Sequence, residues 1–354
     1  MVLKLTDTKT LAVKELCYEC IMGDRITEIP KEQFSLSVGK LATGIGRTII
    51  SQNINCSNQR YITLSALYLL KALVLDSNTK LLLMDEAKQY LRDFSLTGRI
   101  GEIAQGINYI FFQERLNYIE IIDYYEFIKN HTNAKPKGSP DFIMMTSLGQ
   151  YVILESKGSW INHQRTNLKS TIKKGLEQCQ KGNMWLEDKL KFLMVSKVYT
   201  SVVRLKDDIN KQSELIYVDP KYNDKVNKKP EITLLHYSTW FYFIGLNTIA
   251  VNLKELKWLN SNDIKNIKLT QEQINGIEFV LFDKTSTVSN YLNCLFACES
   301  KRINIQFGLS KNIWDFLFNG KGFEDNERKE LFNLKPFSGK EYELFRDGTI
   351  IKYN

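Results

Sequence analysis

The stretch from residue 141 to residue 157 limits the possible folds of this chain more than any other part of the sequence. Two short apolar, β-prone runs at 141–146 and 150–155 flank a three-residue loop that ends in Gly149. A loop of this length closes a hairpin when its glycine takes a left-handed conformation. We therefore predict two antiparallel strands whose register places Asp141 opposite Glu155.

Two carboxylates and an amine converge at the end of this predicted hairpin. Side chains two positions apart share one face of a strand, so Lys157 lies beside Glu155. Opposed carboxylates on neighbouring strands lie about 5 Å apart at Cβ and repel each other unless a cation neutralises them. Mg²⁺ suits such a site, because it binds a few carboxylate oxygens and retains several waters. A charged strand end without any chemistry is the alternative interpretation.

The chemistry that this arrangement favours is hydrolysis of a phosphodiester. A bound Mg²⁺ lowers the pKa of a coordinated water and stabilises the charge that grows on the phosphate. Lys157 is then placed to orient or deprotonate the attacking water, or to support the transition state.

The residues around the hairpin predict an alternation of helices and strands. Apolar positions recur at helical spacing over Arg99–Arg115, and Glu102 lies in the first turn of that helix. An acid there favours the helix dipole even without a catalytic role. A strand is expected over 118–128, and after the hairpin we expect a helix over 167–187 and strands over 191–197 and 214–219. This order predicts an α/β (α+β) core with a mixed central sheet flanked by helices.

With Pro140-Asp141 and Glu155-Ser156-Lys157 as the signature, residues 96–220 resemble the PD-(D/E)XK, or restriction-endonuclease-like, nuclease superfamily. The resemblance implies that Asp141 and Glu155 hold Mg²⁺, together with the main-chain carbonyl of Ser156. It implies that Lys157 assists the attacking water.

The resemblance adds weaker assignments on the two flanking helices. Many members carry a further acid on the first core helix, and Glu102 is the matching residue in this chain. Some members carry a glutamine on the second helix; Gln178 is the nearest match, and Gln164 is another candidate. A solvated polar helix face is the simpler interpretation of these glutamines.

The charge of the chain suits a polyanionic partner. Its net charge is +8 and its pI is about 8.9. Lysines gather in the loop before Asp141 and on the helix after the hairpin, so we expect nucleic-acid contacts at Lys135, Lys137, Lys173, Lys174 and Gln178. Lysine contacts with phosphates supply affinity and salt dependence rather than sequence choice. A solvated loop explains Lys135 and Lys137 equally well.

The length of 354 residues allows two or three domains. We expect a mostly helical N-terminal domain over 1–95, clearest at 61–75 and 79–94, then the core over 96–220. A polar linker at 221–230 precedes a C-terminal α+β domain over 231–354 for target or partner recognition. There we expect a strand at 277–282, helices at 289–297 and 311–318, and a terminal hairpin turning at Asp347-Gly348.

Several classes of protein are disfavoured by the sequence. We find no signal-peptide pattern and no apolar run of membrane-spanning length, and six cysteines fit free thiols in a reducing, cytoplasmic compartment. Cys17-x-x-Cys20 and Cys294–Cys298 could together bind zinc, but Cys294 and Cys298 have the helical spacing of core residues.

The sequence therefore predicts a Mg²⁺-dependent endonuclease acting on DNA, with Mn²⁺ as a possible substitute, in prokaryotic restriction or anti-phage defence. A nuclease subunit of DNA repair, recombination or transposition is an alternative. A nucleic-acid-binding assembly module without turnover is another. RNA as the substrate, a homodimer, and dependence on a partner ATPase all stay open.

Overall fold

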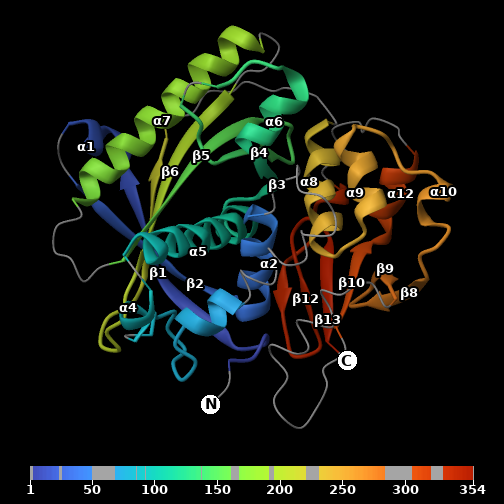
Figure 1. Ribbon diagram of the computed structural model, residues 1–354, viewed down its shortest axis with the longest axis horizontal. Helices are drawn as coiled ribbons and strands as arrows, with labels where there is room; N and C mark the ends of the chain where they lie inside the picture. The colour runs from blue at the N-terminus through green and yellow to red at the C-terminus, as the bar shows by residue number, and fades with distance from the viewer. Residues whose placement is uncertain are drawn as a thin grey trace.

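The computed structural model describes residues 3–23, 26–49, 68–84, 86–91, 93–136, 138–160, 167–190, 195–220, 231–283, 305–319 and 330–353. Two sheets lie side by side with helices packed around and between them (Figure 1). One is a large, curled, mixed sheet of seven strands, and the other is an antiparallel sheet of six. The fold is therefore mixed α+β.

The first 220 residues build the seven-stranded sheet and its helices. Its strands are β1 (Thr8–Cys17), β2 (Glu28–Ser37), β3 (Tyr118–Asp123), β4 (Phe142–Thr146), β5 (Tyr151–Trp160), β6 (Val195–Leu205) and β7 (Glu214–Asp219). The helices are α1 (Tyr18–Met22), α2 (Val38–Ile49), α4 (Ala87–Tyr90), α5 (Asp93–Glu114), α6 (Tyr124–His131) and α7 (Leu168–Lys189). The strand order is β2-β1-β7-β6-β5-β4-β3, with β5–β6 and β1–β7 parallel and the other pairs antiparallel.

Helices α5 and α7 pack on opposite faces of β5. A Cβ on Gly158 of β5 would lie 2.7 Å from the carbonyl oxygen of Ile100 on α5, so only glycine permits this approach. On the other face, Gln178 of α7 contacts Lys157 of β5. Because side chains alternate along a strand, residues 155 and 157 face α7 while residue 156 faces α5.

The predicted hairpin is confirmed. Strands β4 and β5 are antiparallel, and Phe142 pairs with Leu154 and Met145 with Tyr151, which is the predicted register. Gly149 has φ of +76°, in the left-handed region that the turn requires. Extending the register by one residue brings Asp141 opposite Glu155, as the sequence predicts.

The expectation that residues 1–95 are mostly helical is wrong. The region contains β1 and β2, each ten residues long, and both join the same sheet as the hairpin. In β1 the side chains of Lys9, Leu11 and Val13 are buried and their neighbours less so, which is the two-residue period of a strand. The helix expected over 79–94 is correct only in its second half: isolated bridges lie at Lys80 and Leu83, α4 follows them, and α5 begins at Asp93. Of the other expected helix, over 61–75, residues 68–73 are helical as predicted, and residues 61–67 lie outside the described residues.

The strand expected over 118–128 is half correct. β3 ends at Asp123, whose carboxylate accepts a hydrogen bond from the N–H of Glu126 at 2.8 Å and caps α6. This cap starts a helix where an apolar run alone suggests a longer strand. The helix expected over 167–187 is confirmed as α7, with Asn167 as its N-cap. β7 is confirmed, whereas β6 begins only at Val195 and residues 191–194 lie outside the described residues.

Residues after 230 build the second sheet and its helices. These are α8 (Glu231–Phe243), α9 (Asn247–Lys254), α10 (Ser261–Ile264), β8 (Leu269–Ile274), β9 (Ile277–Phe282), β10 (Ile305–Ser310), α12 (Lys311–Asn319), β11 (Phe337–Ser338), β12 (Tyr342–Leu344) and β13 (Thr349–Tyr353). The predicted strand at 277–282, the helix at 311–318 and the terminal hairpin are confirmed. The helix expected at 289–297 and the linker at 221–230 lie outside the described residues.

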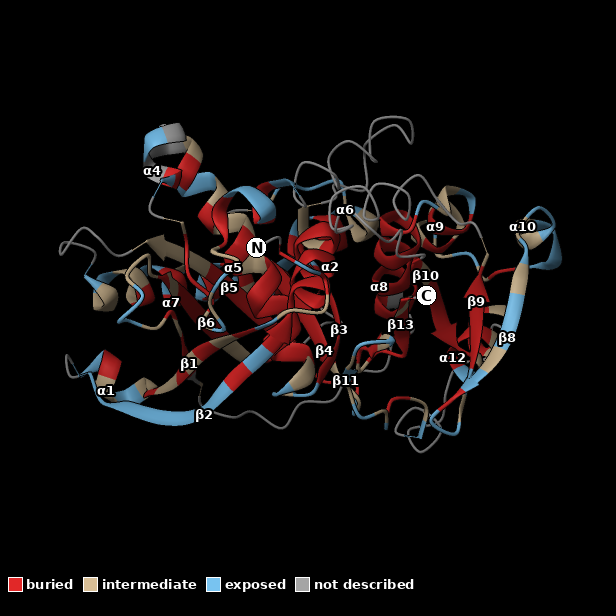
Figure 2. Cartoon of the chain, turned by 90° about the horizontal axis from the view of Figure 1, so that it is seen from below, coloured by how far each residue is buried: buried red, intermediate tan, exposed pale blue. Residues whose placement is uncertain are grey.

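A buried ionic cluster joins the two sheets. Arg47 of α2 pairs with Asp347 of the β12–β13 turn at 2.7 Å, and His236 of α8 contacts the same carboxylate oxygen at 2.8 Å. All three side chains are fully buried, and Figure 2 shows α2, α5 and α8 as the buried centre between the sheets. No helix in the described ranges combines the length and apolar character that a membrane crossing requires.

Candidate active site

Asp141, Glu155 and Lys157 lie together where β4 and β5 diverge. Asp141 immediately precedes β4, and Glu155 and Lys157 lie on β5 with side chains toward α7. Pro140 packs against α7 at Gly182, where a Cβ would lie 2.6 Å from the proline ring. The local sequence therefore positions all three side chains, because one turn and one strand carry them.

Asp141 is held from three directions. Its Oδ2 accepts a hydrogen bond from the main-chain N–H of Ser156 at 2.7 Å, and its Oδ1 accepts one from Gln105 Nε2 at 3.0 Å. Its main-chain carbonyl accepts a hydrogen bond from the N–H of Tyr124 at 3.0 Å. These contacts come from β5, α5 and the start of α6, so the carboxylate is fixed relative to both the sheet and α5.

Lys157 connects the second carboxylate to α7. Its Nζ donates to Glu155 Oε1, and also to Gln178 Oε1 at 3.2 Å. Gln178 Nε2 in turn donates to the main-chain carbonyl of Ser139, in the turn that precedes Asp141. Gln178 is half-buried and bonded to two residues of the site. The interpretation of this side chain as part of a solvated helix face is therefore wrong. Gln164 lies outside the described residues.

The electrostatics show two carboxylates that lack sufficient positive charge. Burial and the neighbouring Asp141 raise the pKa of Glu155 to about 8, although Lys157 acts in the opposite direction. Burial also raises the pKa of Asp141. The Ser156 N–H, Lys157 and Gln105 lower this pKa, but burial has the larger effect. Glu155 is almost completely buried, and its Oε2 has no hydrogen-bond partner among the described residues. Such an orphaned oxygen is costly unless a further cation or donor reaches it.

This donor set suits Mg²⁺ or Mn²⁺. In the described part of the chain, no group of three or more His, Cys, Asp or Glu residues is placed to hold a metal. Asp141 and Glu155 would therefore be the acidic ligands, with the Ser156 carbonyl and water completing the shell. Mg²⁺ commonly binds through one or two carboxylates while keeping several waters. The feature that fits this ion best is the buried Oε2 of Glu155, which lacks a hydrogen-bond partner within the described part of the chain.

Glu102 makes a different contact from the one its sequence position suggests. Its carboxylate pairs with Arg99 on the same helix, at 2.9 Å, while Asp141 is contacted from α5 by Gln105. Sequence reasoning missed Gln105, although it lies one helical turn after Glu102. Helical spacing places both on neighbouring turns but does not reveal which turn of α5 reaches the hairpin.

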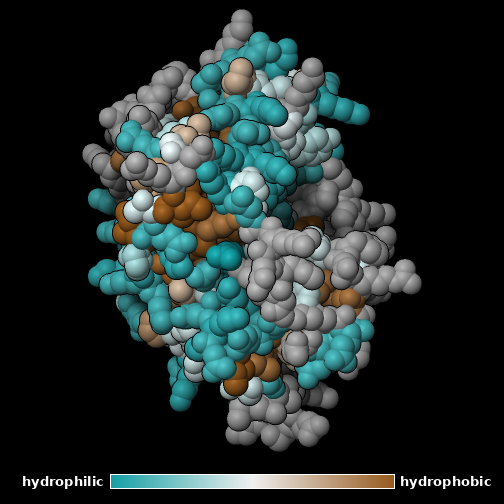
Figure 3. Space-filling model, turned by 90° about the vertical axis from the view of Figure 1, so that its left-hand side faces the viewer, coloured by the Kyte–Doolittle hydropathy of each residue, from teal (hydrophilic) through white to brown (hydrophobic). Residues whose placement is uncertain are grey.

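The lysines expected to contact nucleic acid surround the site unevenly. Lys135 is exposed in the loop before Asp141, Lys173 is half-buried, and Lys174 is exposed on α7. Lys137 lies outside the described residues. Lys174 and the exposed Lys181 lie one helical turn before and after Gln178, so they flank the site along α7. The face of the molecule that Figure 3 shows is mostly hydrophilic.

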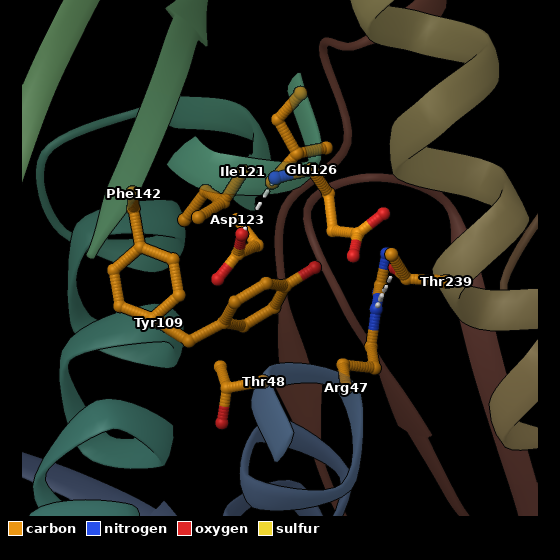
Figure 4. Close-up of a pocket in the computed structure, with 9 residues that line it drawn as sticks. Arg47, Thr48, Tyr109, Ile121, Asp123, Glu126, Phe142 and Thr239 are labelled. Carbon is orange, nitrogen blue, oxygen red and sulfur yellow. Dashed lines mark hydrogen bonds between the residues drawn. The ribbon is translucent and has the colours of Figure 1, made fainter. Parts of the chain in front are cut away.

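A separate small pocket lies between α2, α5, β3, α6, β4 and α8 (Figure 4). Arg47, Tyr109, Asp123 and Glu126 line it, but Asp141, Glu155 and Lys157 do not. The Tyr109 hydroxyl is buried and has no hydrogen-bond partner among the described residues. Arg47 connects this pocket to the joint between the sheets, and Phe142, the residue after Asp141, connects it to the carboxylate site.

Compared with known proteins, the chain matches no family model, no curated protein and no solved structure.

Proposed function

We propose that this protein is a Mg²⁺-dependent nuclease that hydrolyses DNA phosphodiester bonds, with a restriction-endonuclease-like core. The observation that carries the proposal is the half-buried Asp141 beside the buried Glu155, whose Oε2 has no hydrogen-bond partner among the described residues, with the Lys157 ammonium group alongside. A structural ion pair needs equal charges and filled hydrogen bonds, whereas this cluster has one carboxylate in excess.

Each residue has a distinct role in this reaction. Asp141, Glu155 and the Ser156 carbonyl hold the ion, which when bound supplies an activated water and stabilises negative charge on the phosphate. Lys157 lies beside Glu155 and orients the attacking water or supports charge in the transition state. Gln178 holds the Lys157 ammonium by bonding both it and the turn before Asp141. Glu102 is an auxiliary acid at most, since Arg99 already neutralises it.

A non-catalytic nucleic-acid-binding module is the second candidate. It would have no use for the carboxylates of Asp141 and Glu155 side by side near the phosphate backbone, because they would repel it. For the biological role, we propose restriction or anti-phage defence, with a subunit of repair, recombination or transposition as the alternative. RNA as the substrate, a homodimer or a partner ATPase would leave the chemistry of the site unchanged.

The proposal is tested by incubating purified protein with plasmid, linear and single-stranded DNA and with RNA, in Mg²⁺, Mn²⁺ or EDTA. Asp141→Ala and Lys157→Ala are compared with Asp188→Ala and Lys189→Ala, which remove the same charges from an exposed pair on α7. We expect metal-dependent cutting by the wild type and by both surface variants, and none by the two site variants.

Two results would contradict the nuclease. Equal cutting by Asp141→Ala and wild type would place the activity elsewhere, in the protein or in a contaminant. Nucleic-acid binding that is unaffected by either site variant, without cutting in any metal, would favour the binding module. Cutting that begins only when a partner or a second copy is supplied, and that Asp141→Ala abolishes, would retain the chemistry and add an assembly requirement.

A further inference from the structure

A buried chain of hydrogen bonds lies behind the metal-binding face of β5. Ser201 Oγ of β6 donates to Asn108 Oδ1 of α5 at 2.7 Å, and Asn108 Nδ2 donates to Ser156 Oγ at 2.7 Å. Asn108 and Ser201 are fully buried and Ser156 is 8% exposed. Ser156 and Ser201 are paired residues of the parallel strands β5 and β6, so the amide of Asn108 spans both strands from above.

This chain of hydrogen bonds ends at Ser156, which follows Glu155 on β5 and contacts Asp141. The main-chain N–H of Ser156 donates to Asp141 Oδ2 at 2.7 Å. In an extended strand the N–H and C=O of one residue point toward the same neighbour, so the Ser156 carbonyl is directed to the side of Asp141. The pairing of β4 with β5 stops at Phe142 and Leu154, which leaves that carbonyl outside the β4–β5 ladder.

Helix α5 thus reaches the site at two successive turns. Gln105 donates to Asp141 Oδ1 at 3.0 Å, and Asn108, three residues later, fixes Ser156. A hydrophobic residue of similar size could fill the space at position 108. A hydrophobic side chain could not accept from Ser201 and donate to Ser156, whereas the Asn108 amide does both, so its directional bonds fix the position of Ser156.

We propose that Asn108 is a positioning residue of the metal site: by bridging Ser201 and Ser156 it holds the Ser156 main chain at the coordinating position beside Asp141. This inference rests on the proposed nuclease function. Asn108 touches neither metal nor substrate and acts only through Ser156. Residues that orient ligands in this way commonly change metal affinity by about 10–100-fold when removed.

The test is a calorimetric titration of the full-length, metal-free protein with Mn²⁺. Asn108→Ala is compared with Gln113→Ala, because Gln113 is also a fully buried amide of α5 but bonds the carbonyl of Ile119, away from the site. We expect the Mn²⁺ dissociation constant to rise about tenfold or more in Asn108→Ala. It should stay at the wild-type value in Gln113→Ala, even where both variants lose similar thermal stability. Ser201→Ala keeps the Asn108 amide and should raise the Mn²⁺ dissociation constant by an intermediate amount. This variant replaces Asn108→Ala in the test if Asn108→Ala does not fold.

A second readout separates positioning from general destabilisation. In the cutting assay, the Mn²⁺ concentration for half-maximal rate should shift upward for Asn108→Ala, while the rate at saturating Mn²⁺ stays near that of wild type. If wild type binds Mn²⁺ and Asn108→Ala binds it as tightly as Gln113→Ala, the positioning role is refuted and the nuclease proposal stands. If wild type binds no Mn²⁺, the metal site itself is refuted, and this inference with it.

Discussion

The joint between the two sheets and the hairpin site are two of the protein's clusters of buried charge, and they differ in how their charges are balanced. In the joint between the sheets, Asp347 faces both Arg47 and His236, and its second oxygen accepts hydrogen bonds from Thr349. Burial opposes ionisation of Asp347, but Arg47, His236 and Thr349 together hold its pKa well below its ordinary value. Its charge is balanced within the protein.

The hairpin cluster is not balanced. Asp141 and Glu155 share one ammonium group, both pKa values are raised, and one carboxylate oxygen lacks a partner among the described residues. The two clusters also differ in burial: the Arg47 and Asp347 side chains are 0% exposed, whereas Lys157 is 32% exposed and Asp141 is half-buried, so the hairpin cluster can be reached from solvent. A structural cluster completes its own charges and hydrogen bonds, and the hairpin cluster does not.

The largest expected effect is a loss of cutting when a carboxylate of the hairpin cluster is replaced. Glu155→Gln removes a metal ligand, and we expect cutting to fall by about a thousandfold, because metal and electrostatic stabilisation act mainly on the transition state. Rate measurements at saturating Mg²⁺ check this, and circular dichroism should show an unchanged fold. Cutting at more than about a tenth of the wild-type rate would show that Glu155 is not a ligand.

The second effect separates the clusters by stability. Arg47→Met leaves the buried Asp347 with His236 and Thr349 but without its guanidinium partner, so the free energy of unfolding should fall by about 3–5 kcal/mol. Glu155→Gln should instead raise it by about 1–3 kcal/mol in EDTA at neutral pH, since a carboxyl whose pKa is raised is destabilising there. Denaturant titration of both variants measures these changes. A loss of stability in Glu155→Gln equal to that in Arg47→Met would remove the distinction.

The third effect is the pH dependence of metal binding. In the metal-free protein Glu155, with a pKa of about 8, is protonated below that pH, and a metal must displace the proton. The affinity for Mn²⁺ should therefore rise about tenfold per pH unit from pH 6 to pH 8 and become constant above. Titrations of the wild type across this range measure the slope. A pH-independent affinity in wild type would contradict the raised pKa.

The smallest effect concerns the exposed lysines that flank Gln178. Replacing both Lys174 and Lys181 by alanine should reduce the slope of log affinity against log salt by about two, because each phosphate contact releases counterions. Binding is measured in Ca²⁺, to limit cutting. The matched control is Lys189→Ala with Lys211→Ala, two exposed lysines away from the site. An identical slope for both pairs would exclude phosphate contacts along α7.

How much the sequence predicts depends on how local the determining contacts are. The hairpin is specified within seventeen residues by its turn glycine and alternating side chains, and it was predicted to the exact register of Phe142 and Leu154. Strand β1 was missed because its parallel partner β7 lies about two hundred residues later, where Ala12 pairs with Glu214. No local period encodes that pairing.

The same limit applies to the site. Asp141, Glu155 and Lys157 were found because one turn and one strand carry them. Gln105 was missed, since the turn of α5 that meets the hairpin is set by close packing at Gly158 and not by helical spacing. The joint between Arg47 and Asp347 was also missed, because it links residues three hundred positions apart.

The most direct test of the central claim, that Asp141 and Glu155 are completed by a cation, is anomalous diffraction from crystals grown with Mn²⁺. We predict one strong peak about 2.1 Å from oxygens of both carboxylates and of the Ser156 carbonyl, and no peak there in Glu155→Gln. A protein crystallised at saturating Mn²⁺ and pH above 8 that shows no metal between Asp141 and Glu155 would contradict the account.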